Sequence, residues 1–330
     1  MRIISVYPNF ANQGGAQDRA IQLATHFNDS KPVILTETPT SEMLPAYANA
    51  AIYEKFSFSN VKKYATKDTI FLTHHRKLTT KLVLYNWILG NKLKIVHCAR
   101  NTFSNLRYLT LFPKNIIAIS DGVKDNLISY FKVPKENVTV IYNGIRDYRN
   151  FVNTKEINSN IKILLAARIC PVKRQIEIVK SLQNNIPSNI FIDFAGSGPD
   201  EKLLIETIGD SPNFRYIGHI KMEEHLNQYD YVMLFSEKEG FGSSLLYGLM
   251  FGKPLITNDT KVMRDTNEDK EVGFIFKDLE QLKIGLKTLP IPSSPEYKEM
   301  SEKARKKYEE KFREEIMFSN YSIYLKNILN

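Results

Sequence analysis

The sequence predicts an α/β protein with two parallel β-sheets, each belonging to its own domain. Short β-branched runs alternate along the chain with longer segments of helical spacing, which is the pattern of βαβ units. The alternation is interrupted once, at the polar, Asn-rich stretch 147–160, and then starts again. The 330 residues suit two domains of roughly 100–200 residues each. We therefore expect one domain at 1–150, a second at 151–330, and the linker at 147–160.

Each of the two series contains six expected strands. In the first series they are 2–6, 32–35, 69–72, 94–97, 116–119 and 138–141, and in the second 161–166, 190–194, 214–217, 231–235, 254–256 and 273–276. Runs such as IIAIS and KILLAA are almost continuously apolar, as expected of parallel strands buried on both faces. Helical spacing marks 122–131, 174–182 and 280–286, and the Glu- and Lys-rich segment 296–330 is long enough for two helices.

The composition is that of a folded globular protein. Hydrophobic residues make up 43% and charged residues 25% of the chain, and two cysteines exclude a disulfide framework. The N-terminus MRIISVYPNF lacks a long apolar region and a cleavage site, and no run of ~18 apolar residues is present. We therefore expect a reduced, cytoplasmic protein without a signal peptide or a spanning helix.

Positive charge is concentrated in the first half of the chain. Residues 1–150 carry 20 Lys and Arg against 10 Asp and Glu, whereas residues 151–330 carry 25 against 26. A basic half can face nucleic acid, an anionic bilayer surface or an anionic substrate, or it can be a basic background without one partner. We expect no nucleic-acid binding, because no nucleic-acid motif is recognisable. The stretch 76–94 interleaves Leu, Ile and Trp with Lys, and it fits either an interfacial helix or a core helix.

Glycines and cations follow several of the expected strands, where ligands bind in open parallel sheets. Gly14 and Gly15 follow the first strand and open a helix, where a ligand can approach the backbone, although a plain tight turn would look the same. Arg168 and Lys173 follow the first strand of the second series and could converge on a diphosphate, or form a solvated pair. Gly196 opens the turn GSGP after the next strand, which is only a partial glycine motif.

The most informative segment is SEKEGFGSSLLYG, which follows the fourth strand of the second series. Glu239 lies just past that strand, Gly240 and Gly242 bracket Phe241, and a helix is expected to begin near Ser243. Free amides at the helix start could hold a phosphate, aided by the helix dipole. Glu239 could accept hydrogen bonds from sugar hydroxyls, or it could be an exposed loop acid.

By their order and spacing, six segments resemble a family-4 retaining glycosyltransferase of the GT-B fold, of the bacterial surface-polysaccharide type. The resemblance covers nearly the whole chain. The segments are GGAQDRA at 14–20, IIAISDGVKDNLISYFKVPKENVTVIYNGI at 116–145, AARICPVKRQIEIVKSL at 166–182, FAGSGP at 194–199, FRYIGHI at 214–220 and EGFGSSLLYGLMFGKPLI at 239–256.

The resemblance implies two Rossmann-like domains facing across a cleft, with the acceptor on the first domain and a nucleotide-sugar donor on the second. It also implies that a last helix, at about 315–330 with 318–329 as the candidate, packs back on the first domain. Glu239, the candidate catalytic residue of this loop, would contact hydroxyls of the donor sugar. The implied donor-binding residues are Arg168 and Lys173 at the diphosphate, Ser243 and Ser244 through their amides, Gly196, His219 and Ile220 near the nucleobase, Phe241, Gly242 and Tyr247 on the same loop and helix, and Gly14 and Gly15 on the N-terminal side of the cleft.

The sequence departs from that family at two places. A second Glu that binds the nucleotide ribose is replaced by Tyr247, whose phenol can still hydrogen-bond a hydroxyl but carries no charge. Where the family has a His after the strand KIV, this chain has Arg100, which could instead contact a phosphate or an anionic acceptor. His97 lies three residues before Arg100, and His74 and His75, after the strand TIFL, are the other candidates for a contact at the reaction centre.

The resemblance implies transfer of a sugar from a UDP- or GDP-sugar to a glycan or a lipid-linked acceptor, in surface polysaccharide or lipopolysaccharide biosynthesis. No Asp-x-Asp site is present, so we expect no metal and no separate cofactor, with cations and helix-end amides stabilising the leaving diphosphate. Retention by front-face attack is likewise implied by the family alone. The basic first half suits a peripheral position at the inner face of the cytoplasmic membrane. The alternatives are a non-catalytic glycosyltransferase-like partner that binds sugar or protein, and another GT-B enzyme such as an epimerase or a phosphorylase.

Overall fold

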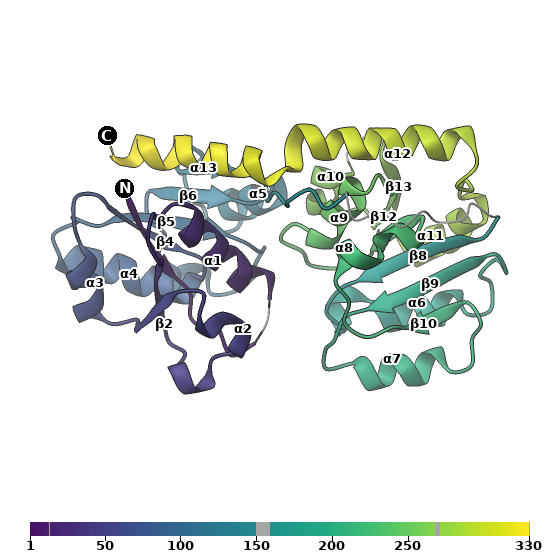
Figure 1. Cartoon of the computed structure of the whole chain (residues 1–330), viewed down its shortest axis with the longest axis horizontal. Helices are drawn as coiled ribbons and strands as arrows, with labels where there is room; N and C mark the ends of the chain where they lie inside the picture. Colours follow the sequence, from purple (N-terminus) through teal and green to yellow (C-terminus); the bar gives the residue numbers. More distant parts are fainter. Residues whose placement is uncertain (13, 150–158, 268–270, 330) are drawn as a thin grey trace. The chain divides into compact units, whose positions relative to one another are not determined.

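The computed structural model describes residues 1–12, 14–149, 159–267 and 271–329, and it divides the chain into two compact units (Figure 1). Unit 1 consists of Met1–Tyr142 and Glu315–Asn330, and unit 2 of Asn143–Glu314. Most of the expected linker at 147–160 lies outside the described residues, and so does the expected boundary between 150 and 151. The two units are therefore described separately.

Unit 1 contains a seven-stranded, fully parallel sheet. Its order is β3-β2-β1-β4-β5-β6-β7. The strands are β1 (Arg2–Val6), β2 (Val33–Thr36), β3 (Ile52–Lys55), β4 (Thr69–Thr73), β5 (Lys94–Ala99), β6 (Asn115–Ala118) and β7 (Val138–Val140). The sequence analysis missed β3, because IYEK is a short edge strand with exposed ends and no continuous apolar run.

Helices cover both faces of this sheet. They are α1 (Gly15–His26), α2 (Pro45–Ala48), α3 (Phe58–Tyr64), α4 (Arg76–Ile88), α5 (Asp121–Ser129) and α13 (Glu314–Leu329), with short 3₁₀ turns η1 (Thr40–Glu42), η2 (Arg107–Leu109) and η3 (Lys135–Asn137). Successive side chains of a strand point to opposite faces. Ile4 and Phe71 accordingly share a core with α3 and α4, whereas Ile3 and Ile70 share one with α1 and α13.

The helix α13 completes the core of unit 1, although it follows the whole of unit 2 in the sequence. Met317, Tyr321 and Leu325 are buried against side chains of β1, β4, β5 and β6. The His26 ring of α1 stacks on Phe318, with ring centroids 3.6 Å apart. Figure 1 shows α13 (yellow) along one side of these strands and α3 and α4 on the other.

Unit 2 contains a six-stranded, fully parallel sheet in the order β10-β9-β8-β11-β12-β13. The strands are β8 (Ile161–Ala166), β9 (Ile190–Ala195), β10 (Phe214–Tyr216), β11 (Tyr231–Leu234), β12 (Leu255–Asn258) and β13 (Gly273–Phe276). Together, the sheets of the two units confirm the predicted fold class of two α/β units with parallel strands.

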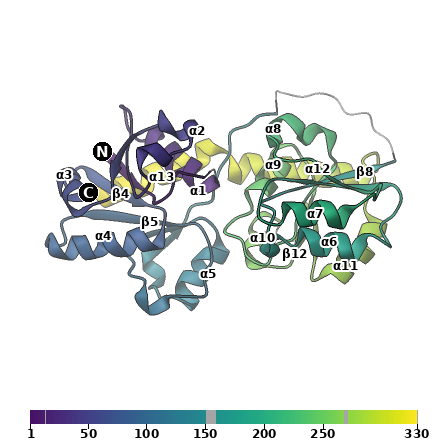
Figure 2. The same ribbon diagram turned by 90° about the horizontal axis from the view of Figure 1, so that it is seen from below.

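The helices of unit 2 also lie on both faces of its sheet. They are α6 (Gln175–Leu182), α7 (Glu201–Ile208), α8 (Met222–His225), α9 (Ser243–Met250), α10 (Lys261–Thr266), α11 (Leu279–Gly285) and α12 (Pro295–Lys307), with short turns η4 (Pro171–Lys173), η5 (Leu226–Gln228), η7 (Leu286–Thr288) and the π-helical η8 (Tyr308–Phe312). Figure 2 shows α6, α7 and α11 grouped together, and residues of all three belong to one core with β8, β9 and β11.

The strand order turns around at one place in each sheet. In unit 1 this place lies between β1 and β4, and in unit 2 between β8 and β11. Ligands of open α/β sheets bind beyond the carboxyl ends of the strands at such a point, because the connecting loops diverge there and leave a crevice. The candidate sites are therefore the loops after β8 and β11 and those after β1, β4 and β5.

Candidate functional site

The strand-end site of unit 2 is centred on an ion pair between Lys173 and Glu239. Lys173 ends η4, just after β8, and Glu239 lies in the loop after β11. The Lys173 ammonium contacts Glu239 Oε1, and the two side chains are only 16% and 14% exposed. The other carboxylate oxygen accepts a hydrogen bond from the Gly240 amide at 3.2 Å. Two residues predicted from separate strand ends are therefore in direct contact.

Backbone hydrogen bonds join the two loops that carry this pair. The Glu237 amide donates to the Val172 carbonyl at 2.9 Å, and the Ser236 hydroxyl donates to the same oxygen at 3.1 Å. Asn258 at the end of β12 exchanges two side-chain bonds with the Ser236 backbone, at 3.0 and 2.9 Å. The buried Asn258 and Ser236 thus fix where the loop after β11 leaves the sheet.

The helix α9 begins directly after these loops. Gly242 is its N-cap residue with φ +76°, a left-handed conformation that an L side chain adopts at a cost. The amides of Ser243 and Ser244 are the first of the helix, so they have no intrahelical acceptor, and the helix dipole favours an anion beside them. The Phe241 side chain is only 2% exposed and packs against Phe312, so this residue can offer a ligand its backbone only.

The ends of β9 and β10 extend the site away from the ion pair. Gly196 has φ +132°, its amide donates to the Gly218 carbonyl at 2.8 Å, and a Cβ there would overlap the carbonyl oxygen of Ala167. His219 is exposed and Ile220 half-buried in the turn that follows. Arg168 is exposed in the loop after β8, and its carbonyl accepts a hydrogen bond from Gln175 at 2.9 Å. The predicted donor residues of unit 2 therefore occupy four adjacent strand ends, in the order β10, β9, β8, β11, whereas Gly14 and Gly15 lie in unit 1 at the start of α1.

Tyr247, which departs from the family pattern, lies on α9 next to a residue that the sequence analysis did not single out. Its ring stacks on that of Tyr148, with centroids 6.5 Å apart and planes inclined by 14°. The Tyr148 amide donates to the sulfur of Met250 at 3.2 Å. Burial raises the pKa of Tyr148, and the nearby Glu223 raises it further. Tyr148 was missed because it lies far from α9 in the sequence and belongs to no glycine or charge motif.

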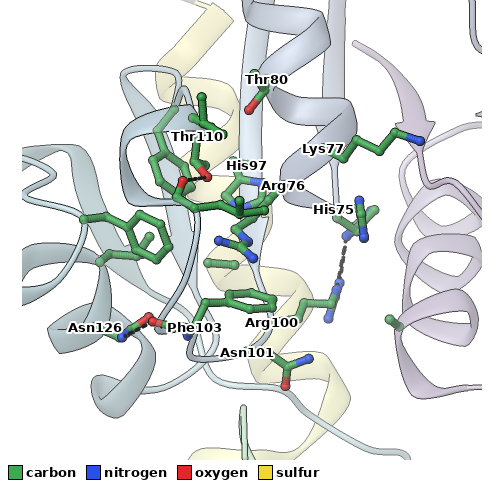
Figure 3. A pocket seen from close by; sticks show the side chains of 18 of the residues that line it. His75, Arg76, Lys77, Thr80, His97, Arg100, Asn101, Phe103, Thr110 and Asn126 are labelled. Carbon is green, nitrogen blue, oxygen red and sulfur yellow. Dashed lines mark hydrogen bonds between the residues drawn. The ribbon is translucent and has the colours of Figure 1, made fainter.

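Unit 1 holds a pocket of about 530 Å³ beyond the ends of β4 and β5 (Figure 3). Three of the predicted residues, His74, His75 and Arg100, line it together with His97. Gly14 and Gly15 are not among the lining residues. The remaining lining residues are Tyr7, Ala16, Arg76, Lys77, Thr80, Lys81, Ala99, Asn101, Phe103, Leu106, Leu109, Thr110, Phe112, Asn126, Leu127 and Phe131.

His74 is held in one tautomer by Arg100. Nε and a terminal nitrogen of Arg100 lie 3.2 and 3.0 Å from His74 Nδ1. A guanidinium has only donors, so Nδ1 accepts and the ring proton resides on Nε2. This Nε2 is buried and has no hydrogen-bond partner among the described residues. Burial and the Arg100 charge lower the pKa of His74 well below its usual range, so the ring is a neutral donor.

The other two histidines have different surroundings. Nδ1 of His97 lies 3.1 Å from the hydroxyl of Thr73 and 2.8 Å from that of Thr79, and burial lowers its pKa to about 3. His75 is the exposed N-cap residue of α4, and partial burial together with Arg76 lowers its pKa. His97 is therefore a structural ring bonded to threonines, whereas His75 remains accessible.

The basic and aromatic wall of this pocket was not predicted as part of a site. The Arg76 guanidinium lies over the Phe103 ring, 3.7 Å from its centroid, and bonds to the carbonyl and side chain of Asn105 at 3.0 and 2.9 Å. Asn126 donates to and accepts from the backbone of Phe103, at 3.0 and 2.9 Å. The only sequence signal here was the amphipathic stretch 76–94, which left the role of Arg76 open.

Within the described ranges, no group of three or more His, Cys, Asp or Glu residues is arranged to hold a metal ion. In that same part of the chain, none of the helices combines the length and the apolar character needed to cross a membrane.

The structure thus combines two parallel sheets of the same turn-around order with a helix start and a Lys173–Glu239 ion pair at the strand ends of the second. Comparisons with known proteins add to this description. Residues 149–307, slightly less than half of the chain, match the family described as Glycosyl transferases group 1.

The relatives agree with this assignment. An O-antigen biosynthesis glycosyltransferase of Escherichia coli, WbnH, is 22% identical over 226 residues, which are 68% of this chain and 60% of that protein. The chain therefore aligns with less than two thirds of the length of this curated relative.

Solved structures cover the whole chain and show the GT-B fold. Anabaena HepE in complex with UDP superposes with a TM-score of 0.85 at 16% identity, covering 99% of this chain and 100% of that one. The lipopolysaccharide outer core galactosyltransferase WaaB superposes with a TM-score of 0.71 at 14% identity, covering 99% of each chain.

Proposed function

We propose that this chain is a family-4 retaining glycosyltransferase that moves a sugar from a UDP- or GDP-sugar to a glycan or lipid-linked acceptor. We place the reaction in surface polysaccharide or lipopolysaccharide biosynthesis. The group 1 domain at 149–307 and the names of the relatives, an O-antigen glycosyltransferase and a lipopolysaccharide galactosyltransferase, support this proposal. The solved complexes of HepE with UDP and with UDP-glucose favour a uridine nucleotide as the donor.

The observation that carries the proposal is the Lys173–Glu239 pair beside the start of α9. Negative charge grows on the leaving diphosphate as the glycosidic bond breaks, and preorganised cations and amides stabilise it. Lys173, Arg168 and the amides of Ser243 and Ser244 would supply these groups. When the diphosphate attracts Lys173, the Glu239 carboxylate becomes available for the hydroxyls of the sugar.

The remaining proposed roles follow from this arrangement. Charge stabilisation by lysine, arginine and helix amides would make a divalent metal unnecessary. Gly196 and the turn at His219 and Ile220 would lie beside the nucleobase. Tyr247 and Tyr148 would lie beside the ribose. We assign the acceptor to the pocket of unit 1, where the neutral Nε2–H of His74 could donate to the substrate. Retention by front-face attack, with the leaving phosphate assisting deprotonation of the acceptor, completes the proposal, and we place the enzyme on the cytoplasmic side of the membrane.

The test is nucleotide binding by the full chain. Thermal unfolding would be followed with UDP, GDP, ADP and CMP, each with and without EDTA, for the wild type, Lys173→Ala and Lys180→Ala. Lys180 is an exposed lysine of α6 outside the site, so its variant is the matched control. We expect one nucleotide to stabilise the wild type and the control regardless of EDTA, and Lys173→Ala to lose most of the shift. No shift with any nucleotide would overturn the donor site and favour a non-catalytic partner protein.

A further inference from the structure

The helix α4 has two faces of different character, one buried in the core and one exposed. Leu78, Leu82 and Val83 are buried in the core of unit 1. The opposite side carries Lys77 and Lys81 in its first half. Its second half exposes large apolar side chains to solvent, with exposed fractions of 41% for Leu84, 56% for Trp87 and 71% for Ile88.

A second apolar strip lies beside this helix. In and just before η2, Leu106, Tyr108 and Leu109 are 57%, 87% and 73% exposed. The strip is tied to α4 through the Arg76–Asn105 bonds and through the Leu111 amide, which donates to the Thr80 hydroxyl at 3.1 Å. Figure 3 shows Thr80 and Thr110 in the upper part of the view and Arg76 nearer its centre, beside His97. We define these six exposed side chains as the outer face: Leu84, Trp87, Ile88, Leu106, Tyr108 and Leu109.

The charge around the outer face is mainly positive. Residues 69–120 contain eight Lys and Arg and no Asp or Glu. Lys77 and Lys81 are paired with Glu37, which comes from the loop after β2. Lys92 and Lys114 are exposed, and the Arg107 guanidinium lies over the Tyr108 ring, 5.2 Å from its centroid. Apolar side chains and aromatic rings fringed by cations are the composition that binds the interface of an anionic bilayer.

We propose that the outer face docks on the surface of an anionic lipid bilayer. The aliphatic side chains and the Trp87 ring enter the boundary between headgroups and acyl chains, while Lys92, Arg107 and Lys114 pair with headgroup phosphates. Charge complementarity favours this occupant. Residues 69–120 contain no acid, and although Glu37 pairs with Lys77 and Lys81, the cations Lys92, Arg107 and Lys114 suit a surface of fixed negative charge. Leu106 and Leu109 belong to the outer face and also line the unit 1 pocket, so the docked pocket opens beside the lipid surface.

This inference deepens the proposed function and rests on it for the acceptor: a lipid-linked acceptor would present its head to the pocket while its chain stays in the bilayer. The docking itself needs no donor and no transfer.

The experiment is co-sedimentation of the full chain with vesicles. The vesicles are phosphatidylcholine alone, or phosphatidylcholine and phosphatidylglycerol at about two to one. We expect binding to the second kind only, weakened by salt because the cations are screened. Trp87→Ser combined with Ile88→Ser should lower the partition coefficient about tenfold, and Tyr108→Ser with Leu109→Ser by a similar factor. Ile323→Ser is the matched control, because Ile323 is 60% exposed on α13 of the same unit.

Three results would overturn the proposal. They are equal binding to both kinds of vesicle, no binding to anionic vesicles at low salt, and loss of binding in the control as large as in the double variants. A shift from dimer to monomer in the double variants, without any vesicle binding, would instead make the outer face a contact with a second copy. The thermal shift caused by the nucleotide, measured on the same variants, separates the two proposals. An outer-face variant should keep this shift. If the wild type binds vesicles but shows no nucleotide shift, the proposed function is overturned and the docking is not.

Discussion

The two units share a strand order but differ in what lies beyond their strand ends. In unit 2 the site consists of glycines, a helix start and an ion pair between Lys173 and Glu239. In unit 1 the pocket is lined by His74, His75 and Arg100 and by aromatic rings, and its buried histidines are kept neutral. The comparison shows that unit 2 keeps paired charges at its strand ends, whereas unit 1 keeps neutral histidines next to a basic surface.

The strongest test of this contrast removes the cation of unit 2. Lys173→Ala should lower turnover about 100-fold or more, because a preorganised charge beside the leaving group is lost. The fold should be retained, since Glu239 is left with the Gly240 amide as a partner. Steady-state transfer to an acceptor, compared with Lys180→Ala, is the measurement. Unchanged turnover in Lys173→Ala would contradict the assignment of the diphosphate to this pair.

A second test concerns the glycines, which unit 2 uses at its strand ends. Gly196→Ala should lower the free energy of unfolding by about 2–3 kcal/mol, because the new Cβ would overlap the Ala167 carbonyl in a backbone of φ +132°. Gly218→Ala is matched, since φ is +72° there but nothing lies within 4 Å of the added carbon. It should cost only about 1 kcal/mol. Urea unfolding of both variants measures the two losses of free energy of unfolding. Equal losses would show that the backbone at Gly196 moves to accommodate the new Cβ, which would contradict this prediction.

The neutral histidines of unit 1 predict a dependence of stability on pH. Burial lowers the pKa of His97 to about 3, from about 6.5 in an unfolded chain. Between these values the unfolded state binds a proton that the folded state does not. The contribution of His97 to the free energy of unfolding should therefore be complete above about pH 6.5 and fall by about 1.4 kcal/mol per pH unit below it.

Chemical unfolding at pH 7.5, 6.5 and 5.5, with His97→Gln for comparison, measures this effect. The glutamine can still bond to Thr79 but does not titrate, so its slope should be smaller. The same slope in both proteins would assign the pH dependence to other groups.

The smallest expected effect concerns the tautomer of His74. Nitrogen chemical shifts at neutral pH should show Nδ1 unprotonated and Nε2 protonated, because Arg100 occupies Nδ1 as a donor. Arg100→Met should release this constraint and let both tautomers appear. If Nε2–H donates to the substrate, His74→Phe should lower kcat about tenfold while the nucleotide shift stays. A loss of nucleotide binding in this variant would show that His74 acts on the donor or on the fold instead.

The sequence was most informative where backbone geometry dictates residue type. The strand-end positions of Lys173, Glu239 and Gly242 could be recognised because parallel strands bring their ends to one edge and φ > 0 favours glycine. The strand β3 was missed because an edge strand needs no apolar run.

The pocket of unit 1 was predicted only through its histidines. Its wall comes from α4, the segment around Phe103 and α5, which meet through Arg76 and Asn126. These are long-range contacts of single side chains with no repeating spacing, so no local pattern marks them. The pairing of Tyr247 with Tyr148 was hidden for the same reason.

The position of α13 has a consequence for how the protein is made. The core that holds Ile3 and Ile70 closes only when Met317, Tyr321 and Leu325 arrive. On a translating ribosome those residues emerge after all of unit 2, so the unit that is synthesised first is finished last. Until then this face of its sheet is covered by α1 but not by α13, so part of its apolar surface stays exposed to solvent.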